Sequence, residues 1–64
     1  MNKKEIAVIT KALVDAKKAA RNCDTQAEVI QATAAVDCIA YDILPLLKDR
    51  DNAIAFAFAQ AVGI

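Results

Sequence analysis

Two runs of apolar residues with heptad spacing restrict the possible folds of this chain more than any other feature of its sequence. The first run is Ile6, Ile9, Leu13, Ala16, Ala20 and Cys23, and the second is Val29, Ala32, Val36, Ile39, Ile43 and Leu46. A 3-4-3-4-3 spacing places each run along one face of a helix. The polar segment RNCDT overlaps the end of the first run at Cys23 and precedes the second run. We therefore expect two helices that fold back on each other as an antiparallel hairpin.

Capping residues predict where the two long helices begin. Asn2 is followed three residues later by Glu5, which is the spacing of a capping box, and Thr25 and Glu28 repeat it. We therefore expect the first helix over residues 3–22 and the start of a second helix directly after Thr25.

Pro45 predicts the end of the second helix. Proline lacks the amide hydrogen of the helical hydrogen bond, and it disfavours the helical conformation of the preceding Leu44. We therefore expect the second helix to cover residues 26–44 and to stop or kink sharply near Pro45. The sequence KDRDN then forms a polar connector.

The last twelve residues, AIAFAFAQAVGI, predict a third helix over residues 52–62. Asp51 can cap its first turn, and Gly63 suits the position after its last turn. The alternation of alanine with larger residues also fits the period of a strand, but alanine favours helices and a lone strand has no pairing partner. As a helix this segment is apolar on all sides, with Phe56 nearly opposite Phe58, so we expect protein to cover more than one side.

The composition indicates more apolar side chains than one short chain can bury. Of the 64 residues, 58% are apolar and 15 are alanine, and a chain of this length buries only roughly 60% of the surface that its unfolded form exposes. Large exposed apolar patches usually contact another subunit or a partner. We therefore expect an all-α homodimeric helical bundle. The expected interface residues are Ile30, Tyr41, Leu44, Leu47, Ile54, Phe56, Phe58 and Val62.

The two parts of the chain carry opposite charges, although the whole chain is neutral. The first 23 residues hold six basic and two acidic side chains, for a net charge of +4, and the rest hold two basic and six acidic ones, for −4. A basic helix beside an acidic helix explains this division. We expect ion pairs across the hairpin between Asp37 and Lys11 and between Glu28 and Arg21.

The first helix is expected to carry its six basic residues in one arc opposite its apolar face. Lysines recur there every seven residues, and this arc is the one charged candidate for recognition. The expected partner-binding residues are Lys4, Lys11, Val14, Lys18 and Arg21. Such an arc can follow a phosphate backbone. The neutral chain and the lack of aromatic residues among the lysines favour a solvated face or a protein partner over nucleic acid.

Several residue types on which catalysis depends are missing. The chain has no histidine and no serine, and its one glycine is Gly63, so no glycine-rich phosphate loop can form. We therefore expect no enzymatic activity and no cofactor. Cys23 and Cys38 cannot complete an ordinary zinc site without histidine, and the hairpin keeps them on the order of 20 Å apart. We expect no metal, two reduced thiols, and burial of Cys38 in a subunit contact.

These features predict a small interaction protein. We expect it to regulate or inhibit another protein, as an accessory factor of the bacterial or phage type. The alternatives are a hairpin dimer that binds nucleic acid through the basic arc and a structural oligomer that acts as a scaffold. The first apolar stretch is interrupted by Lys11 and does not resemble a secretory signal, and the third helix, about 18 Å long, is too short to cross a bilayer. We expect a cytoplasmic protein without membrane contact.

Overall fold

The chain folds into α-helices joined by short connections. The computed structural model describes residues 2–64, which form three helices and no strand. α1 covers Lys3–Ala20, α2 covers Gln26–Arg50 and α3 covers Asn52–Val62. The prediction of an all-helical fold with three helices is confirmed, and α1 ends two residues earlier than expected.

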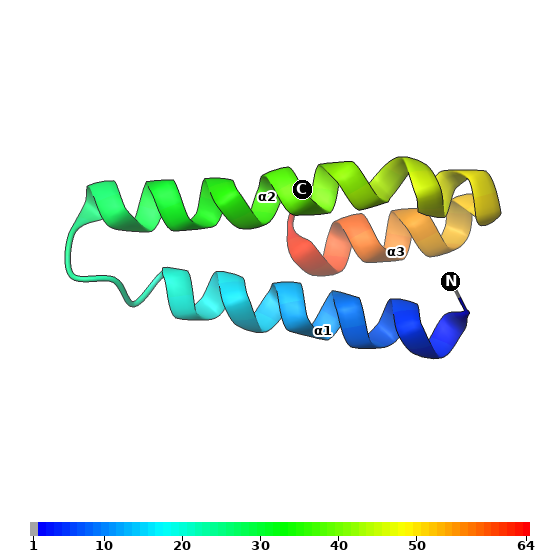
Figure 1. The fold of residues 1–64 in the computed structure, drawn as a ribbon, viewed down its shortest axis with the longest axis horizontal. Helices are drawn as coiled ribbons and strands as arrows, with labels where there is room; N and C mark the ends of the chain where they lie inside the picture. The colour runs from blue at the N-terminus through cyan, green and yellow to red at the C-terminus, as the bar shows by residue number, and fades with distance from the viewer. Residues whose placement is uncertain (1) are drawn as a thin grey trace.

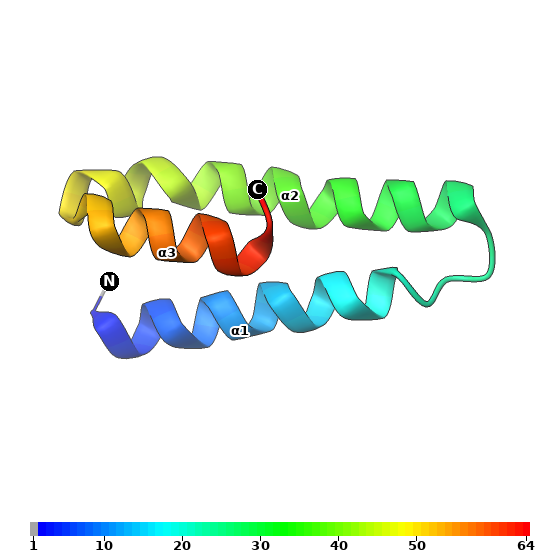
Figure 2. The same cartoon turned by 180° about the vertical axis from the view of Figure 1, so that it is seen from behind.

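The helices lie side by side along the long axis of the molecule. Figures 1 and 2 show α1 and α2 next to each other, joined at one end by residues 21–25. α3 folds back from the other end of α2 and lies along the half of the molecule that is remote from this connection. Each helix contacts both of the others. Near the connection only α1 and α2 lie together, whereas the opposite half contains all three helices (Figure 1).

Side-chain caps define the start of each long helix. The Glu5 N–H donates to Asn2 Oδ1 at 2.8 Å, and the Asn2 N–H donates to Glu5 Oε1 at 3.4 Å, which completes the predicted capping box of α1. The Glu28 N–H donates to Thr25 Oγ1 at 3.2 Å at the start of α2. These bonds satisfy amide groups that have no partner within their helix.

A single residue reverses the chain between α2 and α3. Asp51 is extended (φ −165°, ψ 117°); its N–H donates to the Leu47 carbonyl at 2.8 Å, and its side chain accepts from the Ala53 N–H at 2.8 Å. The expected five-residue connector is therefore reduced to one residue. Gly63 ends α3 at φ 84°, a left-handed conformation that glycine adopts without a steric penalty. Both predicted caps of α3 are confirmed.

α2 continues through Pro45 instead of ending before it. The predicted end at residue 44 is wrong, because α2 reaches Arg50. Pro45 and Tyr41 are exposed, so the Tyr41 carbonyl, which loses its helical partner, lies on the side of the helix that water can reach. Leu47 is 1% exposed, and its burial stabilises the helical turn that follows the proline.

The core combines apolar residues from all three helices. Its buried residues are Ile6, Leu13, Val36, Ala40, Leu47, Ala55, Phe58 and Val62. Phe58 and Leu47 are the largest side chains among those that are almost fully buried. Phe58 lines a small internal space together with Ile6, Ile9, Ile43 and Leu47. α3 therefore places an aromatic ring where α1 and α2 meet.

The buried face of α2 departs from the predicted seam after Val36. Ala40 and Leu47 are buried, whereas the predicted seam residues Ile39 and Leu46 are 52% and 60% exposed. The prediction for these two residues is wrong, because it considered only the contact of α2 with α1. α3 packs against an adjacent side of α2, so the buried face turns toward α3.

Phe58 and Phe56 provide a matched test of this packing, since both lie in α3 but are 2% and 67% exposed. We expect Phe58→Ala to lower the free energy of unfolding by about 3–5 kcal/mol, because it leaves a cavity in the core. Phe56→Ala should change it by less than about 1 kcal/mol. Urea denaturation at low protein concentration, followed by circular dichroism, measures both. Equal losses would contradict the described packing of α3.

Pro45→Ala tests the continuity of α2. Alanine restores the hydrogen bond to the Tyr41 carbonyl, and an interior proline costs a helix about 3 kcal/mol relative to alanine. The greater freedom of alanine in the unfolded chain offsets up to about 1 kcal/mol of this gain. We therefore expect a higher midpoint of thermal unfolding by circular dichroism. A lower midpoint would indicate that the helix ends before residue 45.

Candidate functional site

Several large apolar side chains remain exposed on the bundle. More than half of the residue's surface is accessible in Val8, Ile30, Ile39, Tyr41, Leu46 and Phe56. Four of these residues belong to α2. Single exposed apolar residues are normal on a protein surface, whereas a contiguous set indicates a contact surface. At about 100° per residue, Ile30 and Tyr41 share one side of α2, whereas Ile39 and Leu46 share a different side.

The side of α2 that points away from the core is apolar over most of the helix. At about 100° per residue, a stripe of residues falls opposite the buried Val36 and Ala40. The stripe consists of Ala27, Ile30, Ala34, Cys38, Tyr41 and Pro45, all of them exposed. We call this set the outer face of α2. No charged residue lies within this set, and exposed Gln31 and Asp42 lie along its edge. α2 therefore presents one apolar side to its own chain and a second apolar stripe to solvent.

Five of the eight residues predicted for a subunit interface remain accessible. Ile30, Tyr41 and Phe56 are exposed, and Leu44 and Ile54 are half-buried. The exposure of Phe56 leaves one side of α3 uncovered within a single chain. The expected protein cover on that side is not provided by the chain itself and stays a prediction.

The other three predicted interface residues belong to the core of the single chain. Leu47, Phe58 and Val62 are buried, and we correct their assignment, since they offer no surface to a partner while this fold persists. The periodicity of the third helix could not show that its aromatic ring packs against its own chain. Sequence reasoning also missed the exposure of Ile39 and Leu46, because their heptad spacing placed them in the seam.

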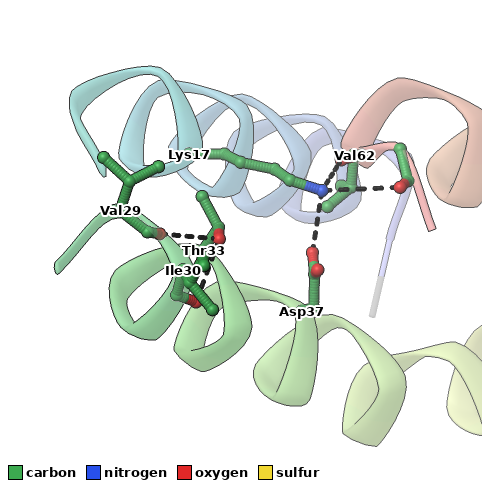
Figure 3. Close-up of polar contacts among 7 residues, drawn as sticks. Lys17, Val29, Ile30, Thr33, Asp37 and Val62 are labelled. Atoms are coloured by element: carbon green, nitrogen blue, oxygen red, sulfur yellow. Dashed lines mark hydrogen bonds and ion pairs between the residues drawn. The ribbon is translucent and has the colours of Figure 1, made fainter. Parts of the chain in front are cut away.

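Lys17 connects all three helices through its ammonium group (Figure 3). Its Nζ donates to Asp37 Oδ1 at 2.8 Å, to the Val62 carbonyl at 3.0 Å and to the Gly63 carbonyl at 3.4 Å. The Lys17 side chain is 12% exposed. The last carbonyls of a helix lack intrahelical partners and carry partial negative charge. Lys17 therefore caps the end of α3 and ties it to α1 and α2.

This contact corrects the predicted electrostatics. Asp37 pairs with Lys17 and not with Lys11, and Lys17 turns inward from the exposed arc, because the end of α3 and the Asp37 carboxylate both attract its charge. Among residues 2–64 this is the one ion pair, so the expected pair of Glu28 with Arg21 does not form there.

The structure separates the residues that were predicted to bind a partner. Lys4, Lys11, Lys18 and Arg21 are exposed, and Val14 is half-buried. Lys11, Val14 and Lys18 line a groove between α1 and α3, whereas Lys4 lines a different hollow on α1. Only part of the predicted arc therefore belongs to one surface.

The groove between α1 and α3 has a volume of about 650 Å³. α1 contributes Lys3 to its edge in addition to Lys11 and Lys18, and α3 contributes apolar residues that include Ala57 and Ala61. The sequence indicated the lysines through their regular spacing. It could not indicate the α3 wall, which depends on how α3 folds back.

α2 also meets a simple criterion for crossing a membrane. Within residues 2–64 it is the one helix that is long and apolar enough by length and composition. The core helix of a soluble protein meets the same criterion, but only 11% of the most apolar stretch of α2 is buried. The exposed outer face of α2 accounts for this low value, and Asp37 and Asp42 lie within the same stretch.

The two cysteines are free thiols in different environments. Cys23 is half-buried next to the connection between α1 and α2, and Cys38 is exposed on the outer face of α2. The expected burial of Cys38 in a subunit contact stays a prediction. In the part of the chain that the structure describes, no three acidic, cysteine or histidine side chains come together as a metal site would require.

Comparisons of this chain with protein-family models, with curated proteins and with solved structures found no match. The surfaces that can indicate a function are the outer face of α2 and the groove between α1 and α3.

Lys17→Met tests the contact between the three helices, since it keeps the length of the side chain and removes its charge. We expect the free energy of unfolding to fall by about 1–3 kcal/mol, because Asp37 and two carbonyls lose a charged donor. Lys18→Met changes the next residue of α1, which is exposed, and should alter stability by less than about 0.5 kcal/mol. Chemical denaturation compares the two variants. Equal losses would mean that the contacts of Lys17 do not stabilise the fold.

Proposed function

We propose that this chain is a non-enzymatic interaction protein, a hairpin of α1 and α2 completed by α3, which forms a homodimer and regulates another protein by binding it. The observation that carries the proposal is the outer face of α2. This apolar stripe of exposed residues extends over about 27 Å at the helical rise of 1.5 Å per residue. Burial of an apolar surface of this extent against another apolar surface is favourable in water.

The outer face of α2 is complementary to itself. In an antiparallel pairing centred near residue 36, Ile30 of one copy lies opposite Tyr41 of the other, and Ala34 lies opposite Cys38. Large side chains then meet on both sides of the centre, and Ala27 lies opposite Pro45 at each end. Small side chains meet at the centre, where the helices can approach closely. A contact of this symmetric kind closes with two copies.

The charged residues of α2 favour a protein contact over a lipid contact. A membrane-spanning α2 would place Asp37 and Asp42 in the hydrocarbon, where an aspartate near the helix centre costs about 2.5–3.5 kcal/mol. It would also remove Asp37 from the ammonium group of Lys17, which lies 2.8 Å away. Docking of a second copy on the outer face preserves this contact.

A regulatory role is supported by the residues that the chain has and by those that it lacks. Without histidine or serine, it lacks the side chains most often used as general base and hydroxyl nucleophile. A dimer formed through the outer face of α2 leaves the groove between α1 and α3 accessible. Each copy then retains a second surface with which to bind a different protein.

Ile30→Asp and Val8→Asp form a matched test of the dimer, since the two side chains are 61% and 66% exposed and only Ile30 lies on the outer face of α2. We expect light scattering to show a dimer for the unmodified chain and for Val8→Asp, and a monomer for Ile30→Asp, because the new charge would be buried in the contact. Circular dichroism should show helices in all three proteins.

Three outcomes would contradict this proposal. An unmodified chain that stays monomeric at every concentration tested would exclude the homodimer. Growth beyond a dimer would favour a scaffolding oligomer. Flotation of the chain with phosphatidylcholine–phosphatidylglycerol vesicles would favour a lipid contact for α2.

Cys38 offers a second measurement of the same contact. Because it lies close to the centre of the proposed pairing, a short bifunctional thiol reagent should join two copies. Cys38→Ser should abolish the linked product, and Cys23→Ser should leave it unchanged. A product that depends on Cys23 would place the contact near the connection between α1 and α2.

A further inference from the structure

The groove between α1 and α3 has one cationic wall and one uncharged wall. Lys3, Lys11 and Lys18 of α1 lie along the first wall, and Ala57 and Ala61 belong to the second. α3 contains no ionisable side chain. The site therefore combines an apolar surface with positive charge along one edge only.

Small side chains on both walls leave room in the groove for another helix. Ala7 of α1 and Ala57 and Ala61 of α3 line the groove and are exposed. Phe58 lines it as well but is held in the core at 2% exposure, so the ring is already packed from below. Small residues allow two helix backbones to approach closely, and an amphipathic helix in an apolar groove is a common mode of peptide recognition.

The three lysines of the groove lack acidic partners within the chain. The one ion pair of residues 2–64 is at Lys17, and Asp15 is the one acidic residue in the groove lining. Lys3, Lys11 and Lys18 are separated by eight and seven residues, so positive charge recurs about every two helical turns over roughly 22 Å. A helix that lies along the groove meets this charge at the same interval.

We propose that this groove binds an amphipathic helix of the regulated protein, whose acidic residues lie seven or eight positions apart beside its apolar face. The apolar face packs against the alanines, and the carboxylates lie next to the lysines. Apolar burial supplies affinity, and charge sets the orientation of the bound helix. The inference rests on the proposed function, because a dimer formed through the outer face of α2 leaves this groove open.

A different protein suits this groove better than a second copy of the chain. In a second copy, α2 carries Asp42 and Asp49 seven residues apart, which is the spacing that the lysines of the groove require. However, the groove and α2 are different surfaces, so such a contact would be head-to-tail and would not close with two copies. The proposed dimer also occupies the apolar outer face of α2, which such a contact would need.

A designed peptide tests the proposal. The probe is a fluorescently labelled helix of about 15 residues, with leucines along one face and glutamates seven positions apart beside them. Its control carries lysine in place of glutamate. We expect saturable binding of the glutamate peptide in fluorescence anisotropy, and about tenfold weaker binding of the lysine peptide at low salt.

Lys11→Glu and Lys4→Glu form the matched pair of variants. Both residues are exposed on α1, but Lys11 lines the groove and Lys4 does not. We expect Lys11→Glu to weaken binding of the glutamate peptide about tenfold and Lys4→Glu to change it less than about twofold. Ala57→Glu, which adds a negative charge to the uncharged wall, should abolish binding.

The failure of this inference can be distinguished from the failure of the dimer. A monomer that binds the peptide through Lys11 would retain the groove and exclude the dimer. A dimer that does not bind the peptide, or that responds equally to both lysine reversals, would overturn the groove assignment. Assembly beyond a dimer that Lys11→Glu reverses would assign the groove to a second copy. Binding of single-stranded RNA more tightly than the glutamate peptide, with an affinity that falls steeply as salt is raised, would indicate that the lysines bind phosphates. Assembly that Lys11→Glu reverses and preferential RNA binding would each overturn the inference.

Discussion

Burial of Phe58 between the two longer helices is the interaction on which the rest of the structure depends. Its ring packs with Ile6, Ile43 and Leu47 around a small internal space, and a buried aromatic side chain of this size is one of the largest apolar contributions that a chain of 64 residues can make. For the ring to reach this space, α3 must return along the bundle. The helical turn after Pro45 and the reversal at Asp51 make this return possible.

The position of α3 explains both of the surfaces that remain open. Since α3 packs against one side of α2, the buried face of α2 turns toward it, and the opposite side is left with an uninterrupted apolar stripe. On α1, the end of α3 draws Lys17 inward, where it binds Asp37 and two carbonyl groups. Lys11 and Lys18 stay outside and form the edge of the groove between α1 and α3. The packing of α3 therefore separates a lysine that holds the fold together from lysines that stay exposed.

Sequence reasoning succeeded where a feature depends on near neighbours. The capping box of Asn2 and Glu5 and the caps of α3 at Asp51 and Gly63 could be predicted because their hydrogen bonds join residues a few positions apart. The outer face of α2 was partly predictable as well, since Ile30 and Tyr41 were expected at a subunit interface and are exposed. The predicted end of α2 at residue 44 was wrong, because burial of Leu47 stabilises the helix beyond Pro45 by more than the proline destabilises it.

The sequence by itself determined that this chain is helical and how its helices begin, because helix propensity and capping act within a turn or two of the chain. It also determined that the helices carry more apolar residues than one side of each helix can hold. Only the tertiary structure decided which apolar residues are buried: Ala40 and Leu47 instead of Ile39 and Leu46, and Phe58 instead of Phe56. The physical reason is that the hydrophobic effect is non-directional. In a helix with two apolar sides, the side that packs against the other helices is the one that is buried. For α2, the position of α3 determines which side that is.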